Sequence, residues 1–247
     1  MASWLRSISG AGETGLWPKS AAHAASGMPL GATGRAGFGS GDSSKPAGRA
    51  HSDPGRQFDA IAATWDAKHG PASARAAEFS TRIRYLRAVC RDLDRPRVLD
   101  LGCGTGQTLL HLANVVRSGV GVDISPAMIS RAGRSAGASH LHFAVADAAD
   151  FCATCSKRFD LVLLIGVLEH LSDRTAALAG VARVLRARGH LIVISPHPWN
   201  PLCLAKRLWD GGRDAPPTDH PSPLQLRKMA ARKGFELSAI RALPYAP

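Results

Sequence analysis

The sequence predicts an α/β fold, in which a doubly wound and mostly parallel sheet carries helices on both faces. Five short apolar segments alternate with helix-like segments between residues 97 and 195. A glycine-rich turn at residues 102–106 directly follows the first apolar segment, and aspartates follow the next two. Alternating strands and helices of this kind form parallel sheets with right-handed crossovers, and ligands bind beyond the carboxyl ends of the strands.

The expected elements follow from apolar spacing. A first helix is predicted at residues 78–93, because its apolar residues recur at steps of three and four and so lie on one face. The expected strands are 97–101, 120–124, 141–147, 159–165 and 190–195. The helices expected between and after them are 107–116, 126–136, 173–188 and 223–233, and a last strand is expected at 235–243.

The chain divides into a tail and one domain. Residues 1–52 are rich in Gly, Ala and Ser, with few large apolar residues and no periodicity. Such a segment cannot bury enough surface to offset its ordering entropy, so we expect a disordered tail, with a mitochondrial presequence as the alternative. Residues 53–247 are expected to form the domain, and 196–222 an insert or lid within it.

Composition excludes some classes of protein. The longest apolar run, 161–168, is far shorter than the roughly 20 residues that a membrane-spanning helix needs. The net charge of +12 is compatible with a nucleic-acid partner, but the basic residues are scattered and form no dense run. Cys152 and Cys155 form a single CxxC, and His140 and His142 lie at the wrong end of a predicted strand to complete a metal site with them. No metal is therefore expected.

The glycine-rich turn predicts close approach of the backbone to a ligand. Gly102, Gly104 and Gly106 leave no Cβ in the way and precede a helix start, which is electropositive. A dinucleotide fingerprint needs glycine at 107 or 109, where the chain has Gln107 and Leu109. A phosphate-binding Walker loop is also excluded, since no Gly-Lys-Ser/Thr follows.

Acidic residues favour a ligand with hydroxyls and positive charge. Asp100 lies within the turn motif, and Asp123 and Asp147 end the second and third predicted strands. A carboxylate at the end of the second strand can accept hydrogen bonds from both hydroxyls of a ribose. A carboxylate after the third strand can reach the exocyclic amine of a base.

The chain resembles the class I S-adenosylmethionine-dependent methyltransferases, in the small-molecule branch that includes quinone-biosynthesis enzymes. The resemblance covers roughly residues 58–241, and rests on five segments in the family's order. These segments are LDLGCGTG (99–106), GVDIS (121–125), VADAADF (145–151), FDLVLLIGVLEHL (159–171) and VLRARGHLIVIS (184–195). The resemblance implies S-adenosylmethionine as cofactor, with the glycines near its methionine part, Asp123 at the ribose and Asp147 with Ala148 at the adenine. The remaining implied cofactor residues are Asp100, Ile124, Ile165 and Gly166.

The acceptor is less defined. The resemblance implies methyl transfer to an oxygen, carbon or nitrogen of a small or lipid-like molecule, with peripheral membrane contact as one option. His170 and His197 are the candidates for a catalytic base, although an acceptor that is already nucleophilic needs none. Residues 58–66 and the insert are expected to build the acceptor pocket. An RNA-modifying enzyme and a cofactor-binding protein without activity remain alternatives.

One departure concerns the end of the sheet. The family closes its sheet with two strands after the last helix, whereas here only 235–243 follows it. The final antiparallel strand is therefore expected to be missing. The expected location is the cytoplasm, or the mitochondrion if residues 1–52 are a presequence.

Overall fold

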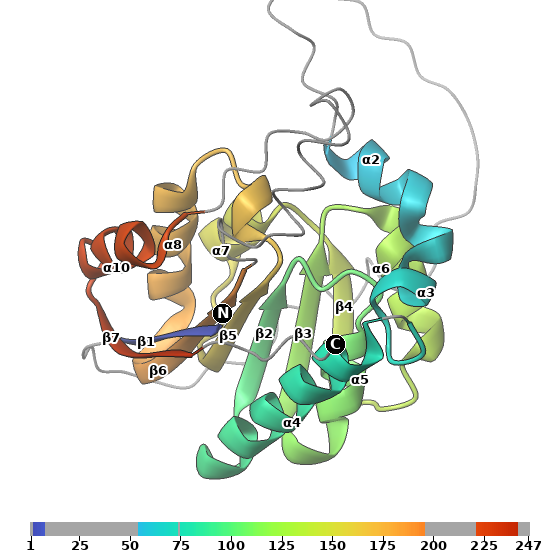
Figure 1. Cartoon of the computed structure of the whole chain (residues 1–247), viewed down its shortest axis with the longest axis horizontal. Coiled ribbons are helices and arrows are strands. Elements are labelled where there is room, and N and C mark those ends of the chain that lie inside the picture. The colour runs from blue at the N-terminus through green and yellow to red at the C-terminus, as the bar shows by residue number, and fades with distance from the viewer. Residues whose placement is uncertain (1, 8–53, 74, 196–220, 242–247) are drawn as a thin grey trace, which may run out of the picture.

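The computed structural model describes residues 2–7, 54–73, 75–195 and 221–241, and shows the predicted α/β architecture (Figure 1). Within these residues a seven-stranded sheet has the order β4-β3-β2-β5-β6-β1-β7. Neighbouring strands from β4 to β6 are parallel. The strands are β1 (Ala2–Ser7), β2 (Arg97–Leu101), β3 (Ser118–Asp123), β4 (Leu141–Val145), β5 (Phe159–Ile165), β6 (Leu185–Ile194) and β7 (Phe235–Arg241).

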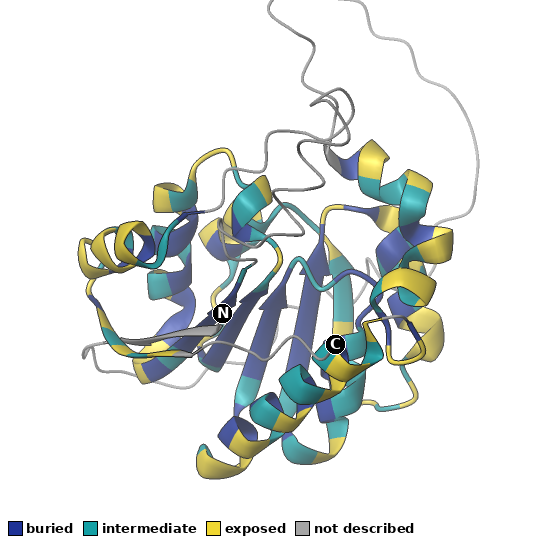
Figure 2. Cartoon of the chain, in the orientation of Figure 1, coloured by how far each residue is buried: buried dark blue, intermediate teal, exposed yellow. Residues whose placement is uncertain are grey.

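Helices cover both faces of the sheet, and two apolar clusters form the core. One cluster joins helices α4 and α5 to one face of the strands, and the other joins α7, α8 and α10 to the opposite face. In β5, Leu161 and Leu163 belong to the first cluster, and Val162 and Leu164 to the second, as the twofold alternation of a strand requires. The central strands β2, β3 and β5 are accordingly almost wholly buried, while the outer helix surfaces are exposed (Figure 2).

The helices have these bounds: α2 (Pro54–Ile61), α3 (Trp65–His69), α4 (Ala76–Asp92), α5 (Gln107–Leu112), α6 (Pro126–Ser135), α7 (Ala148–Thr154), α8 (Arg174–Val184) and α10 (Pro223–Ala231). Three short 3-10 helices are η1 (Ala62–Thr64), η2 (Ala113–Val115) and η3 (Leu168–His170). Within the described residues no helix is long and apolar enough to cross a membrane.

The predicted helix 173–188 is wrong at its C-terminal end. Helix α8 ends at Val184, and Leu185 already belongs to β6, where it pairs with Phe159 of β5. Arg188 has a φ of 60°, a left-handed conformation that interrupts a helix, and the register of the two strands shifts before His190. Leu185 continues the apolar spacing of the helix, so periodicity alone placed the boundary four residues late.

The predicted tail and the predicted missing strand both need correction. Residues 2–7 form β1, which pairs antiparallel with both β6 and β7 (Figure 1). An antiparallel strand is therefore present in the sheet, contributed by the N-terminal end of the chain. Segment 2–7 contains neither glycine nor proline, and pairing there satisfies backbone groups along the edges of β6 and β7 that are otherwise unpaired. The other residues expected in the tail, 8–52, lie outside the described residues.

A proline in β1 tests this pairing. Leu5 pairs with Leu191 on one side and Leu237 on the other. Leu5→Pro removes a backbone donor from a strand with neighbours on both sides, so we expect a lower melting temperature and faster hydrogen exchange in 190–194 and 235–241. Ala24→Pro, outside the strand, is the control. Equal protection in both variants would show that β1 does not hold these strands.

Candidate cofactor site

The turn between β2 and α5 has the backbone geometry that its glycines predicted. Gly102, Gly104 and Gly106 have φ values of 71°, 54° and 76°, which L side chains rarely adopt. A Cβ at Gly102 would lie 2.3 Å from a methyl of Val167, and one at Gly106 would lie 2.7 Å from the Phe143 ring. The turn is therefore restricted to glycine by conformation and by space.

Asp123 connects this turn to the end of β3. Its Oδ2 accepts a hydrogen bond from the Gly104 backbone N–H at 2.8 Å, and its Oδ1 accepts one from the Ser125 N–H at 2.9 Å. The side chain is buried, and burial raises its pKa despite these two hydrogen bonds, which act in the opposite direction. Each carboxylate oxygen has a further lone pair, so both can still accept a hydroxyl from a ligand.

A buried Asp–Arg pair lies beneath the turn. Asp100 is 2% exposed, and neither its Oδ1 nor the Nε of Arg82 on α4 has a hydrogen-bond partner among the described residues. Burial raises the pKa of Asp100 to about 7, an effect that Arg82 opposes and Asp123 reinforces. Arg82 is a site residue that its position in the sequence did not reveal. Arg82 directly precedes Ile83, which lies on the apolar face of the predicted helix. The only signal in the sequence is this charged residue beside an apolar helix face.

The ends of β3 and β4 form an apolar surface. Ile124 is 37% exposed and Val145 is 49% exposed, although both are large apolar residues. Val145 pairs with Asp123 across the two parallel strands. The Ile124 and Val145 side chains therefore lie near Asp123, the residue predicted to bind the ribose. Asp147 accepts hydrogen bonds from the backbone N–H groups of Ala149 and Asp150 and caps α7, which Ala148 begins. The adenine role of Asp147 and Ala148 stays a prediction.

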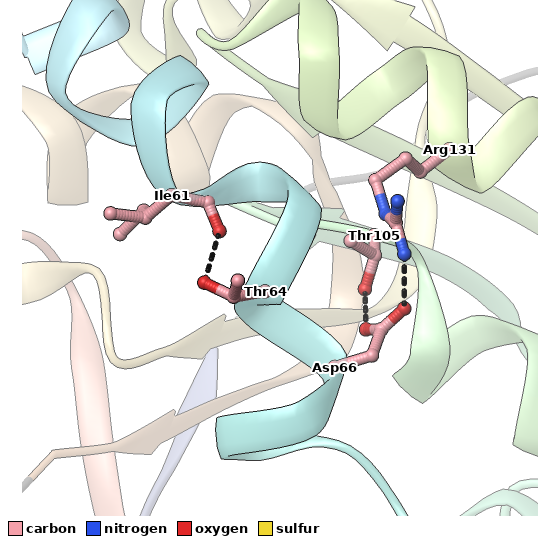
Figure 3. Close-up of polar contacts among 5 residues, drawn as sticks. All are labelled: Ile61, Thr64, Asp66, Thr105 and Arg131. Carbon is pink, nitrogen blue, oxygen red and sulfur yellow. Dashed lines mark hydrogen bonds and ion pairs between the residues drawn. The ribbon is translucent and has the colours of Figure 1, made fainter.

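Helices α2 and α3 lie against the same loops. Asp59 of α2 accepts hydrogen bonds from Ser125 Oγ and from the Ala127 N–H. Asp66 of α3 accepts one from Thr105 Oγ1 and pairs with Arg131 (Figure 3). Segment 58–66 therefore contacts the loops that follow β2 and β3, and its part in an acceptor pocket stays a prediction.

The end of β5 supplies the remaining predicted residues. Ile165 ends the strand, and Gly166 has a φ of 66° and donates its N–H to the Ile194 carbonyl at 2.8 Å. Glu169 lies 3.5 Å from the Ser195 hydroxyl, and burial raises its pKa. The His170 and Phe58 rings pack in a T-shaped arrangement, with their centroids 5.3 Å apart.

Two further predictions concern His197 and the CxxC motif. His197 and the segment 196–220 lie outside the described residues. Cys152 of the CxxC is buried in the core cluster, and the described residues contain no group of side chains that could hold a metal. Only Cys152 lies within α7, and Cys155 follows its last residue in an extended conformation.

The fold and the site define an α/β protein in which a glycine turn and a buried carboxylate meet at the carboxyl ends of neighbouring parallel strands. Comparison with known proteins agrees. Residues 99–193 match the model of a methyltransferase domain family. An O-methyltransferase, cnsE, from Penicillium expansum is 37% identical over 109 residues, which are 41% of this chain and 39% of that protein. The ubiquinone biosynthesis O-methyltransferase of Xanthomonas oryzae pv. oryzae is 29% identical over 148 residues, 59% of this chain and 62% of that protein.

A solved structure supports the fold. The YcgJ protein from Bacillus subtilis is 23% identical with a TM-score of 0.50, covering 61% of this chain and 66% of that one. Residues 99–193 are thus similar to a methyltransferase domain family, and the described residues share the fold of the YcgJ protein. The chain spans less than two thirds of the length of the two curated relatives.

Asp123 can be tested directly. Asp123→Asn keeps the shape of the side chain but removes the charge, and weakens an acceptor that serves two backbone donors. If Asp123 accepts the ribose hydroxyls, S-adenosylhomocysteine should bind with an affinity lower by about 2–3 kcal/mol, because a charged acceptor is lost. Calorimetry measures the change, and circular dichroism checks the fold. Unchanged affinity in a folded variant would limit Asp123 to a structural role.

The buried Asp100 predicts a pH dependence of binding. With a pKa of about 7, Asp100 is mostly protonated at pH 5.5 in the ligand-free protein. A ligand that carries an ammonium group favours the carboxylate, so affinity should rise roughly tenfold or more between pH 5.5 and 7.5 and then level off. Asp100→Asn should remove this dependence in calorimetric titrations.

Stability gives an independent check of the same group. The pKa of Asp100 in the folded protein is raised above its usual value of 3.8. Its proton therefore stabilises the fold fully below pH 3.8, and this contribution is lost as the pH rises through about 7. Urea unfolding of the ligand-free protein should show this decline in the wild type and less of it in Asp100→Asn. Parallel curves for the two proteins would contradict the assignment.

Proposed function

We propose that this chain binds S-adenosylmethionine at the carboxyl ends of β2, β3 and β4 and transfers its methyl group to a small or lipid-like acceptor. The observation that carries the proposal is the Asp123 carboxylate, held between the glycine turn and the end of β3 by two backbone hydrogen bonds. It faces the position where a parallel sheet of this topology binds ligands.

The residues present fit the chemical groups of this cofactor. Asp123 would accept the ribose hydroxyls, and the exposed surfaces of Ile124 and Val145 would cover one face of the adenine. Gly102 and Gly104 allow close approach of the methionine part, and Gly166 and Ile165 flank it on the β5 side. Asp100 and Arg82 carry opposite charges, and each has one buried polar atom without a partner among the described residues. Asp100 would bind the ammonium group of the methionine part, and Arg82 would bind its carboxylate.

The protein's contribution to transfer is mainly positional. When bound, the cofactor supplies a methyl group on a positively charged sulfur, which leaves as a neutral thioether. The chain must align the acceptor about 3 Å from that methyl and exclude water. Helices α2 and α3 contact the loops of the site and would help to enclose the acceptor. His170 and Glu169 follow β5 and can take a proton from an acceptor hydroxyl, and His197 stays a second candidate.

The acceptor class rests on the relatives. The two curated relatives act as O-methyltransferases according to their names, one of them in ubiquinone biosynthesis. We extend this to an oxygen acceptor on a small or lipid-like molecule, with nitrogen and carbon as alternatives and peripheral membrane contact through the insert at 196–222. The net charge of +12 favours an RNA acceptor as the second candidate. The proposed location is the cytoplasm, or the mitochondrion if residues 1–52 direct import.

Binding and product analysis test the function. Calorimetry should show micromolar binding of S-adenosylmethionine and its demethylated product, and none of NAD. Small-molecule extracts and total RNA, incubated with methyl-labelled cofactor, should then show label in the small-molecule or lipid fraction. Label in RNA would favour the second candidate, cofactor binding without any labelled product would favour an inactive protein, and binding of NAD alone would overturn the proposal.

A further inference from the structure

Two carboxylates on α2 and α3 contact the loops that form the cofactor site. We propose that Asp59 and Asp66 are positioning residues, which act through Ser125 and Thr105 to hold these loops in their binding geometry. The two helices and the cofactor then stabilise each other's binding. This inference rests on the proposed function, since it concerns affinity for S-adenosylmethionine and its product.

Asp59 acts on the loop that follows β3. Its Oδ1 accepts a hydrogen bond of 2.5 Å from Ser125 Oγ and one of 3.1 Å from the Ala127 N–H. The Ser125 backbone N–H donates in turn to Asp123, so one fully buried serine connects the two carboxylates. These hydrogen bonds lower the pKa of Asp59, which therefore stays charged. A displaced Asp59 would leave the Ser125 hydroxyl without this acceptor, next to the carboxylate that takes the ribose.

Asp66 acts on the glycine turn itself. Its Oδ1 accepts a 2.5 Å hydrogen bond from Thr105 Oγ1, and Thr105 lies between Gly104 and Gly106 with only 2% of its surface exposed (Figure 3). The second oxygen of Asp66 pairs with Arg131 of α6 at 3.6 Å. The neighbouring Trp65 lies against Gly104: a Cβ at that glycine would be only 3.4 Å from the indole Nε1.

Both contacts join distant segments. Asp59 and Ser125 are 66 residues apart in sequence, and Asp66 and Thr105 are 39 apart. If α2 and α3 separate from the sheet, Ser125 and Thr105 each lose an acceptor, and the turn loses the indole packed against Gly104. Two segments that stabilise the same loop conformation are thermodynamically linked, and the linkage is reciprocal. Cofactor binding should therefore hold α2 and α3 in place, and their contacts should strengthen cofactor binding.

A double-mutant cycle tests the Asp66 contact. The variants are Asp66→Ala, Thr105→Val and the double variant, with affinity for S-adenosylhomocysteine measured by calorimetry. We expect each single variant to bind about tenfold more weakly and the double variant to bind no more weakly than the singles, because both remove one interaction. Additive losses would show that Asp66 does not act through Thr105.

Asp59→Ala tests the second contact, and two variants serve as controls. Asp59→Ala should also weaken binding about tenfold, and its effect should add to that of Asp66→Ala because the two contacts are separate. Arg131→Ala removes only a partly exposed ion pair and should change affinity less than threefold. Asp92→Ala, at the exposed end of α4, should change nothing.

Hydrogen exchange distinguishes positioning from simple stability. In the wild type, the ligand should slow exchange in residues 54–69, and this slowing should shrink in Asp59→Ala and Asp66→Ala. A wild type that fails to bind the ligand overturns the proposed function instead. A wild type that binds, with variants of equal affinity and equal ligand-dependent protection, overturns this inference alone.

Discussion

The site depends on one interaction, the carboxylate of Asp123 between two backbone amides. By accepting from the Gly104 and Ser125 N–H groups, it fixes the distance between the glycine turn after β2 and the loop after β3. These loops belong to neighbouring parallel strands, so the sheet brings them together and the carboxylate sets their spacing. A neutral side chain would satisfy the amides less strongly, because charge-assisted hydrogen bonds are about twice as strong as neutral ones.

The glycine turn could be predicted from the sequence because its requirement is local. Three residues with positive φ need glycine wherever they occur, and the strand before them and the helix after them have clear periods. The position of Asp123 at the end of β3 followed from the same alternation, whereas β4 ends at Val145 and Asp147 caps α7 instead of ending the strand. The ends of elements were harder to predict. Leu185 keeps the apolar spacing of α8 although it belongs to β6, because both the helix face and the strand bury it in one core cluster.

The unpredicted part of the site consists of long-range contacts. Nothing in the spacing of Asp59, Asp66 or Arg82 relates these residues to loops that lie far along the chain. Their partners Ser125 and Thr105 are small polar residues of an ordinary kind, whose burial only the fold determines. The strand at residues 2–7 belongs to the same class. Its pairing depends on the edges that β6 and β7 present and not on any strong pattern within six residues.

The charges beneath the turn bear on the kind of ligand that we propose for the site. Asp100 and Arg82 lie close enough for each to alter the other's pKa, yet each keeps a buried polar atom without a described partner. Burying a polar atom without a hydrogen-bond partner costs free energy, and these two atoms do not satisfy each other. A ligand with one positive and one negative group removes both costs at once, whereas a purely anionic pyrophosphate would oppose Asp100. The same pair that disfavours a dinucleotide therefore supports the proposed binding of the amino-acid part of S-adenosylmethionine, independently of the glycines.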